Sequence, residues 1–295
     1  MSAFTAISSD VLFGQILLGL INGAFYALLS LGLAVIFGML NVINFTHGAF
    51  YMMGAFGSWL LLSQLGIGYW PALILSPLLV GLAGILIERV LLRWTYRLDH
   101  IYGFLLTYGL ALVIESVFRY RWGVTGQPYA VPPALRGALD LEFMILPYYR
   151  GWVLAVSVLV CFATWLLIER TRLGATLRAA TERPDLVQAF GINVPLLVTL
   201  TYGGGVALAA FAGVLAAPLY QVNPIMGSNI MVVVFAVVVI GGMGSIAGSV
   251  VTGFALGVIE GLTKVFFPPA SSIVIFVTMI VVLLIRPSGL FGKAA

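Results

Sequence analysis

Long apolar stretches, separated by short polar ones, run through the whole chain. A helix of about 20 apolar residues is long enough to cross a hydrocarbon core of about 30 Å. The first run is unusually long and residues 241–249 can also form one bent segment, so eight spans fit nearly as well as nine. Either number predicts an all-α polytopic membrane protein. With nine spans, the helices are expected at residues 11–37, 46–64, 71–92, 101–120, 151–169, 196–217, 230–248, 249–267 and 271–285.

The composition supports this class. Hydrophobic residues make up 62% of the 295 residues and charged residues only 8%, which leaves too little polar surface to cover a soluble domain. We expect one transmembrane domain over residues 1–295, with a cytoplasmic loop at about 170–195 and an external loop at about 121–150. The domain is expected to be embedded in the lipid bilayer, which is therefore one of its partners. The net charge of +4 then reflects membrane topology, and no nucleic-acid partner is expected.

Basic residues gather in three segments that nine spans would place on one side of the membrane. Because Lys and Arg near span ends stay in the cytoplasm, we expect an external N-terminus and a cytoplasmic C-terminus. The first 88 residues contain no Lys or Arg, which agrees with this orientation and removes the positive segment of a cleaved signal peptide. The three segments carry Arg89, Arg93 and Arg97; Arg170, Arg172, Arg178 and Arg183; and Arg286 with Lys293.

Catalytic and cofactor motifs are missing from the sequence. A nucleotide-binding P-loop needs Gly-x-x-x-x-Gly-Lys-Ser/Thr, and the nearest candidate, Gly292-Lys293, lacks both the first Gly and the Ser or Thr. The two histidines, His47 and His100, lack the spacing of metal ligands, and Cys161 is the only cysteine. We therefore expect no enzyme activity, metal or cofactor in this chain.

Polar residues inside the predicted spans are costly in lipid and mark either helix contacts or a path for a solute. In the first span, Gln15, Asn22, Tyr26 and Ser30 fall on one helix face. Small and amide residues of this kind let helices approach and hydrogen-bond, but they can equally line a path. Both interpretations stay open, and Gln15 and Asn22 are candidate path residues.

Two polar interruptions predict broken helices near residues 38–48 and 218–229. The first contains Asn41, Asn44 and His47, and such a break must be buried in protein or face a watery cavity. A plain interfacial turn explains the same residues equally well. We take all three as candidate path residues, with His47 favoured as a structural histidine over a proton relay. Both breaks place Asn before a helix start that contains Gly, which suggests an internal repeat.

Small residues recur at every fourth position near the end of the chain and predict a close-packing surface. That surface faces either another helix of this chain, which we favour, or a second subunit. Two carboxylates have a cation four residues later, Glu115 with Arg119 and Glu260 with Lys264, and these pairs are expected to be local and structural. The small residues are Gly241, Ser245, Ser249, Gly253, Gly257 and Gly261.

A dense cluster of charges at residues 169–185 lies between two apolar runs. Just beyond it, Pro184 and Asp185 favour a helix start and Gly191 favours a stop, so residues 184–190 should form a short helix. Leu186 and Phe190 belong to its apolar side. Because so short a helix is marginal in water, this side must pack on the membrane domain or dock into a partner.

These residues carry a resemblance to a known family. Residues 174–180 (Gly-Ala-Thr-Leu-Arg-Ala-Ala), followed by Asp185, Ala189 and Gly191-Ile192-Asn193, resemble the cytoplasmic coupling loop of ABC-importer permeases of the branched-chain amino-acid type. Together with residues 19–28, 41–48 and 241–245, the chain is similar to the LivH-like permease subunits of that family over roughly 15–290. The family's general coupling motif begins Glu-Ala-Ala, where this chain has Arg178-Ala179-Ala180.

The resemblance implies partners and a mechanism. Such permeases pair with a second, homologous or identical, permease subunit and two cytoplasmic ATPase subunits that bind the ATP, and they receive substrate from an extracytoplasmic binding protein at a bacterial inner membrane. The implied cargo is a branched-chain or related amino acid. The alternative is an ion-coupled secondary transporter of small polar solutes that uses Glu115 or Glu260 as a coupling group. The contacts implied for the ATPases are Arg178, Glu182, Asp185, Leu186 and Phe190.

Overall fold

The computed structural model describes residues 8–40, 44–96 and 98–292. Three residues singled out above, Asn41, Arg97 and Lys293, lie outside this part of the chain. The described part is almost entirely helical, which confirms the predicted class, and its long helices correspond to the nine predicted spans. They are α1 (Ser9–Leu40), α2 (Thr46–Leu65), α3 (Tyr69–Val90), α4 (His100–Trp122), α5 (Tyr148–Arg170), α8 (Val194–Ala216), α9 (Met226–Gly241), α10 (Ile246–Phe266) and α11 (Val274–Ile285).

The long helices differ in how they meet the surroundings. Six of them (α1, α3, α4, α5, α8 and α10) are long and apolar enough to cross a membrane, and α9 and α11 are shorter apolar helices. Helix α2 carries polar residues at its start, but most of its residues are buried, so it lies inside the bundle and not at its rim. The chain is therefore a multi-pass membrane protein, and α2 is shielded by the helices around it.

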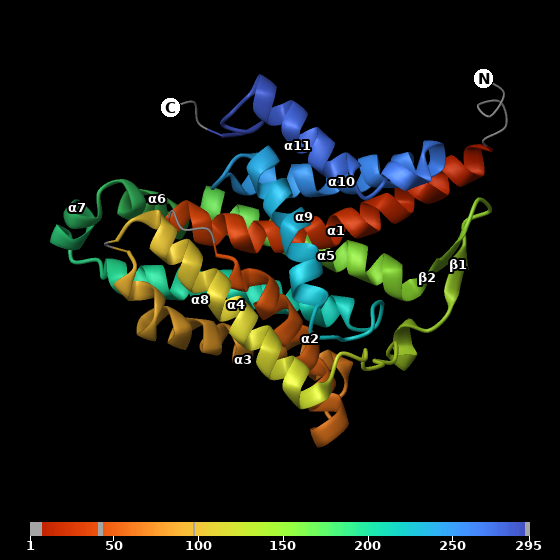
Figure 1. The fold of residues 1–295 in the computed structure, drawn as a ribbon, viewed down its shortest axis with the longest axis horizontal. Coiled ribbons are helices and arrows are strands. Elements are labelled where there is room, and N and C mark those ends of the chain that lie inside the picture. Colours follow the sequence, from red (N-terminus) through yellow and green to blue (C-terminus); the bar gives the residue numbers. More distant parts are fainter. Residues whose placement is uncertain (1–7, 41–43, 97, 293–295) are drawn as a thin grey trace.

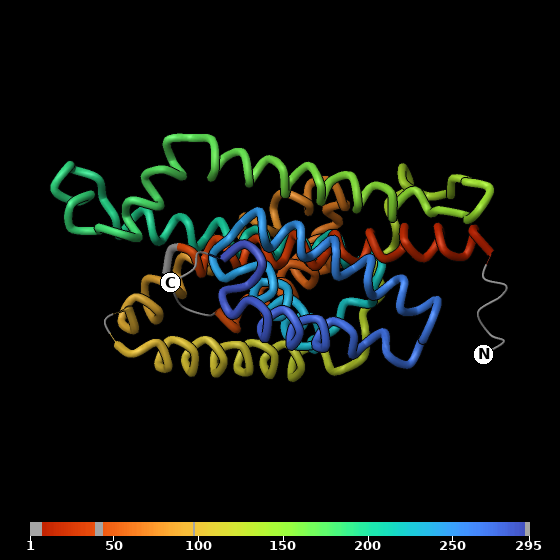
Figure 2. The backbone as a smooth tube through the Cα atoms, turned by 90° about the horizontal axis from the view of Figure 1, so that it is seen from above, coloured from red at the N-terminus to blue at the C-terminus, as the bar shows by residue number. Residues whose placement is uncertain are grey.

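The two ends of the bundle carry different segments. The short helices α6 (Arg172–Glu182) and α7 (Pro184–Ala189) and the turn between α3 and α4, with its 3-10 helix Leu92–Trp94, lie at one end, which we call the coupling end. The start of α1 and the strands β1 (Ala138–Asp140) and β2 (Ile145–Pro147) lie at the other, the hairpin end (Figures 1 and 2). Helices α1, α5, α8 and α10 run between the ends, and α9 crosses them steeply.

Helices α1 and α10 touch along their backbones through glycines. A Cβ atom added at Gly257 would lie 2.3 Å from the carbonyl oxygen of Gly19, and one added at Gly253 would lie 2.5 Å from the nitrogen of Ala27. Ser30 Oγ also lies 3.2 Å from the carbonyl oxygen of Ser249. The surface of small residues therefore packs within this chain, as favoured from the sequence.

The predicted boundary between the last long spans was wrong. Helix α9 ends at Gly241 and α10 begins at Ile246, so Gly241 and Ser245 do not share a helix with Gly257. Gly242 and Gly244 have φ angles of 97° and 84°, values that end a helix and favour glycine. The recurrence of small residues at every fourth position continues through this turn, from Gly241 and Ser245 to Ser249, which is why it does not reveal the break.

The two predicted interruptions meet in the fold. Helices α2 and α9 both start inside the bundle, and they cross where a Cβ atom added at Gly48 would lie 2.6 Å from the carbonyl oxygen of Gly227. The second interruption also contacts the predicted external loop, because Gln127 and Val222 exchange backbone hydrogen bonds of 2.7 and 3.0 Å. This loop holds the antiparallel hairpin of β1 and β2, which the hydrophobic pattern does not predict because strands of three residues show no clear alternation.

Candidate translocation path and coupling surface

The short helix α7 presents part of its apolar side outward. It forms as predicted at Pro184–Ala189, and Gly191 follows it with a φ of 82°. Val187 is buried against Ala180 and Val194, so this side chain anchors the helix. Leu186 is 55% exposed and Phe190, just after the helix, is 84% exposed. The described chain thus covers neither of the two predicted docking residues.

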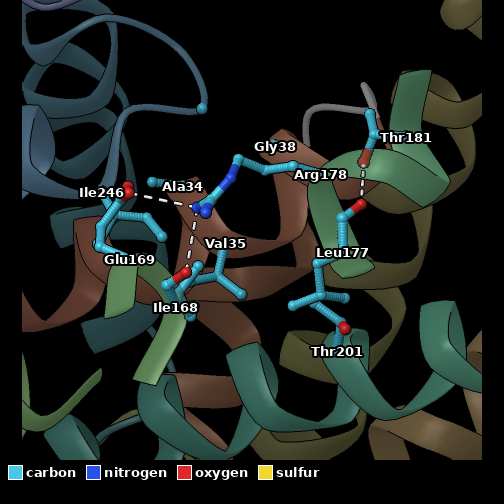
Figure 3. Close-up of a pocket in the computed structure, with 11 residues that line it drawn as sticks. Ala34, Val35, Gly38, Ile168, Glu169, Leu177, Arg178, Thr181, Thr201 and Ile246 are labelled. Atoms are coloured by element: carbon cyan, nitrogen blue, oxygen red, sulfur yellow. Dashed lines mark hydrogen bonds and ion pairs between the residues drawn. The ribbon is translucent and has the colours of Figure 1, made fainter. Parts of the chain in front are cut away.

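The polar residues of this loop divide into two groups. Glu182 and Asp185 lie on the exposed surface. Arg178 instead turns back toward the end of α5, where its Nη1 donates to the carbonyl oxygen of Ile168 at 3.0 Å and to Glu169 Oε2 at 3.2 Å (Figure 3). Arg178 therefore fixes α6 against α5, while its side chain keeps about half of its exposure.

A small cavity of about 90 Å³ lies beside Arg178. It is lined by α1, the end of α5, α6, α8 and the turn that precedes α10, including Gly38, Thr201 and Gly244 (Figure 3). Any movement of α6 against the bundle would change this cavity, because α6 supplies one of its walls. The coupling end is therefore a junction of helices from both halves of the chain.

A larger cavity, of about 450 Å³, has both polar and apolar walls, and we call it the central cavity. Helix α1 supplies Asn22, Phe25 and Tyr26, α2 supplies Tyr51, and α9, α10 and the segment before α9 supply the other lining residues. Of the predicted path residues on α1, Asn22 lines this cavity and Gln15 does not. The Gln15 carbonyl oxygen instead faces Gly261, where an added Cβ atom would lie 2.4 Å away.

Asn44 and His47 are fully buried at the start of α2. Asn44 donates from Nδ2 to the hydroxyl of Tyr202 at 3.1 Å, and its Oδ1 accepts from the backbone nitrogen of Thr46 at 3.1 Å. His47 Nε2 lies 3.0 Å from the carbonyl oxygen of Leu29. Because a carbonyl oxygen can only accept, Nε2 carries the proton, and Nδ1 is a buried acceptor without a partner in the described part of the chain. Neither residue lines the central cavity.

Sequence reasoning missed a buried carboxylate near the coupling end. Glu88, on α3, is 1% exposed, and its two oxygens lie 2.9 Å from the Tyr96 hydroxyl and 2.7 Å from the Thr199 hydroxyl. It joins α3, the turn before α4 and the start of α8. The available signal was a lone acidic residue in an apolar run without a cation three or four residues away. The neighbouring Arg89 indicated membrane topology, and Glu88 was not singled out beside it.

Comparisons with known proteins agree on one family. The family model "Branched-chain amino acid transport system / permease component" matches residues 15–283. The high-affinity branched-chain amino acid transport system permease protein BraD of Pseudomonas aeruginosa is 31% identical, and LivH of Escherichia coli is 28% identical, each over 95% of both chains.

A second type of permease from the same transport systems also matches. The permease protein LivM of Escherichia coli is 26% identical over 90% of this chain and 67% of its own length. Among solved structures, PsaBC from Streptococcus pneumoniae in complex with Fab matches with a TM-score of 0.47 and 13% identity, over 91% of this chain and 89% of that one.

Proposed function

Because the chain belongs to the family of permease components of branched-chain amino acid transport systems, we propose that it is the membrane subunit of an ABC importer for branched-chain or related amino acids. The family match over residues 15–283 carries this proposal. The exposed Phe190 and Leu186 on a short helix that is otherwise anchored support it, because an energy-coupling partner needs such a docking surface.

The proposed assembly has a second permease, two ATPases and a binding protein. The similarity to both LivH and LivM supports a second, homologous permease subunit, and an identical one would serve the same role. ATP binds to the ATPase subunits, since this chain lacks a P-loop and needs no cofactor of its own. The binding protein delivers substrate at the hairpin end, where the external loop lies.

The proposed orientation follows from the basic residues of the coupling end. In a bacterial inner membrane this end faces the cytoplasm, because it carries the Arg residues of the 170–183 segment, and the start of α1 faces outside. The C-terminus is then cytoplasmic. In this orientation α7 lies where a cytoplasmic ATPase can reach it.

The proposed mechanism is alternating access driven from outside this chain. ATP binding closes the ATPases and moves α6 and α7. Contacts of Val187 and Arg178 attach these two helices to the membrane domain. Because Arg178 holds α6 to α5, the movement is passed to the long helices. These helices then open the path on one side and close it on the other.

The experiment replaces Phe190, the proposed docking residue, by a charged residue. In the complex reconstituted with its ATPases, Phe190→Asp should weaken ATPase binding about tenfold or more, the loss expected for an aromatic interface anchor, and should reduce uptake in parallel. The control for ATPase binding is Phe267→Asp, which should leave that binding unchanged, because Phe267 is 62% exposed and directly follows α10, whose last turn lies at the hairpin end, away from α7. Normal ATPase binding and uptake in the Phe190 variant would refute the docking surface.

A second arm of the experiment tests the energy source. Uptake should require all the ATPase subunits and hydrolysable ATP, and an ion gradient without ATP should drive none. Uptake by this chain alone under an ion gradient would contradict the importer assignment and favour an ion-coupled transporter.

A further inference from the structure

The central cavity has one ion pair in its lining. Among the described residues that line it, Glu260 and Lys264 are the only charged ones, and both lie on α10. Glu260 Oε1 lies 2.5 Å from Lys264 Nζ, and the Tyr26 hydroxyl donates to Glu260 Oε2 at 2.8 Å. The side chains are 13% and 38% exposed, so the pair is partly desolvated and still reachable from the cavity.

Local helix stability does not explain this pair. An i,i+4 ion pair stabilises a helix only slightly, whereas charges inside a membrane domain are costly and usually serve a function. Its position also distinguishes it from the pair Glu115–Arg119 on α4. Arg119 is half-exposed and lines neither the central cavity nor the small cavity beside Arg178. The placement of both charges in the lining of one cavity therefore needs a cause other than helix formation.

The walls around the pair have a mixed character. Asn22 from α1 and Asn229 from α9 offer amide donors and acceptors. Phe25, Ile230 and Val233 form an apolar part of the same cavity. A volume of about 450 Å³ lies within the range of about 300–1,000 Å³ that is usual for small-molecule sites.

We propose that the Glu260–Lys264 pair is a binding site for the zwitterionic head of an α-amino acid. Glu260 receives the α-ammonium group and Lys264 the α-carboxylate, so the two residues exchange their bond to each other for two bonds to the substrate. The apolar wall then receives an aliphatic side chain. This inference rests on the proposed function and deepens it by assigning the residues that hold the cargo inside the membrane.

Charge balance explains why such a site would prefer a zwitterion. A zwitterion satisfies both residues at once and adds no net charge to a partly buried site. A simple cation would occupy Glu260 and leave Lys264 without its partner, and an anion would do the reverse, each at the cost of an uncompensated buried charge. An ion pair held by a single turn of helix can exchange partners without a change of fold, because both residues stay on α10.

The experiment uses the complete reconstituted complex with the second permease, the ATPases and the binding protein in proteoliposomes, with radiolabelled leucine as the probe. Lys264→Met and Glu260→Gln each remove one charge with little change in size. Each should lower leucine uptake per ATP hydrolysed about tenfold or more, the factor expected for losing a charged hydrogen bond to the substrate. The matched control is Arg119→Met, which removes the cation of the other pair and should keep wild-type uptake.

Two further variants separate substrate binding from a structural role. Lys264→Arg keeps the charge and should restore most of the uptake. The double variant Glu260→Gln with Lys264→Met leaves no unpaired charge, so a merely structural pair predicts uptake better than in either single variant. The binding site predicts uptake as low as in the single variants or lower, while ATP hydrolysis stimulated by the binding protein stays within about twofold of wild type.

The outcomes are distinguishable. Wild-type leucine uptake in the single variants, or recovery in the double variant, would overturn the assigned site and leave the proposed function intact. Absence of uptake of any amino acid by the wild-type complex would overturn the proposed function and the assigned site together.

Discussion

The contact between α1 and α10 predicts a large stability difference between two Gly→Ala substitutions. Gly257 is buried in this contact, and an alanine there would place its Cβ atom 2.3 Å from the Gly19 carbonyl oxygen and 2.4 Å from Gly23 Cα. Both neighbours are backbone atoms, so no side chain can rotate away. Gly204, on the exposed side of α8, has no atom within 4 Å of an added Cβ and serves as the control.

The expected size follows from two opposing effects. Overpacking a well-filled contact costs about 1–3 kcal/mol, and the upper end applies because two backbones must separate. Replacing Gly by Ala inside a helix gains about 1 kcal/mol. Gly257→Ala should therefore destabilise the protein by about 2 kcal/mol. Gly204→Ala gains the helix preference alone and should stabilise it by about 1 kcal/mol.

Reversible unfolding in mixed micelles measures this difference. The six tryptophans give a fluorescence signal, and the midpoint and slope of the transition yield the free energy of unfolding. The two variants should differ by about 3 kcal/mol, roughly a factor of 100 in the equilibrium constant. A Gly257→Ala variant at least as stable as wild type, beside a stabilised Gly204→Ala, would show that the two backbones are not in contact.

Two other substitutions test buried polar groups. The Tyr129 hydroxyl is buried without a hydrogen-bond partner in the described part of the chain, so Tyr129→Phe should leave stability unchanged or raise it by about 1 kcal/mol. Burial raises the pKa of Tyr129 from 10.0 to about 12, so the hydroxyl ionises at a lower pH in the unfolded chain than in the folded one. The free energy of unfolding is therefore unaffected by this group below pH 10 and falls as the pH rises toward 12. The Phe variant should lack this alkaline loss in pH-dependent unfolding. Glu88→Ala removes the acceptor of the Tyr96 hydroxyl and should cost about 2–3 kcal/mol, whereas Glu88→Gln, which keeps one oxygen, should cost less than half of that. Equal unfolding midpoints for the two Glu88 variants would show that the carboxylate is not a structural acceptor.

The short helix α7 was the element that the sequence predicted best, for a local reason. Helix α7 begins at a proline and is followed by a glycine with positive φ, and these residues act on the backbone next to them. No distant contact is needed to locate such a helix. Its orientation was not predictable, because the burial of Val187 depends on Ala180 and Val194 on neighbouring segments.

The central cavity was only half predictable, because it is made by segments that are far apart in sequence. The polar face of α1 pointed to Asn22, but a helix pattern does not tell whether a face meets a cavity or another helix. Part of this same face proved to be packing surface, where Gly19 meets Gly257. The sequence indicated only a local pair for Glu260 and Lys264, because Tyr26, whose hydroxyl donates to Glu260, is 234 residues away from it in the chain.

The two cavities are joined by the helices that line both of them. Helix α1 contributes Asn22 and Tyr26 to the central cavity and Gly38 to the small cavity beside Arg178. Helix α10 contributes Glu260 to the first, and its initial residue Ile246 to the second. Because their backbones touch through glycines, neither helix can slide past the other without breaking that contact. A displacement that α6 imposes on the small cavity therefore acts on α1 and α10 as one body. Helix α9 is held to the same body, because a Cβ atom added at Gly248 on α10 would lie 2.2 Å from the carbonyl oxygen of Gly241, the last residue of α9.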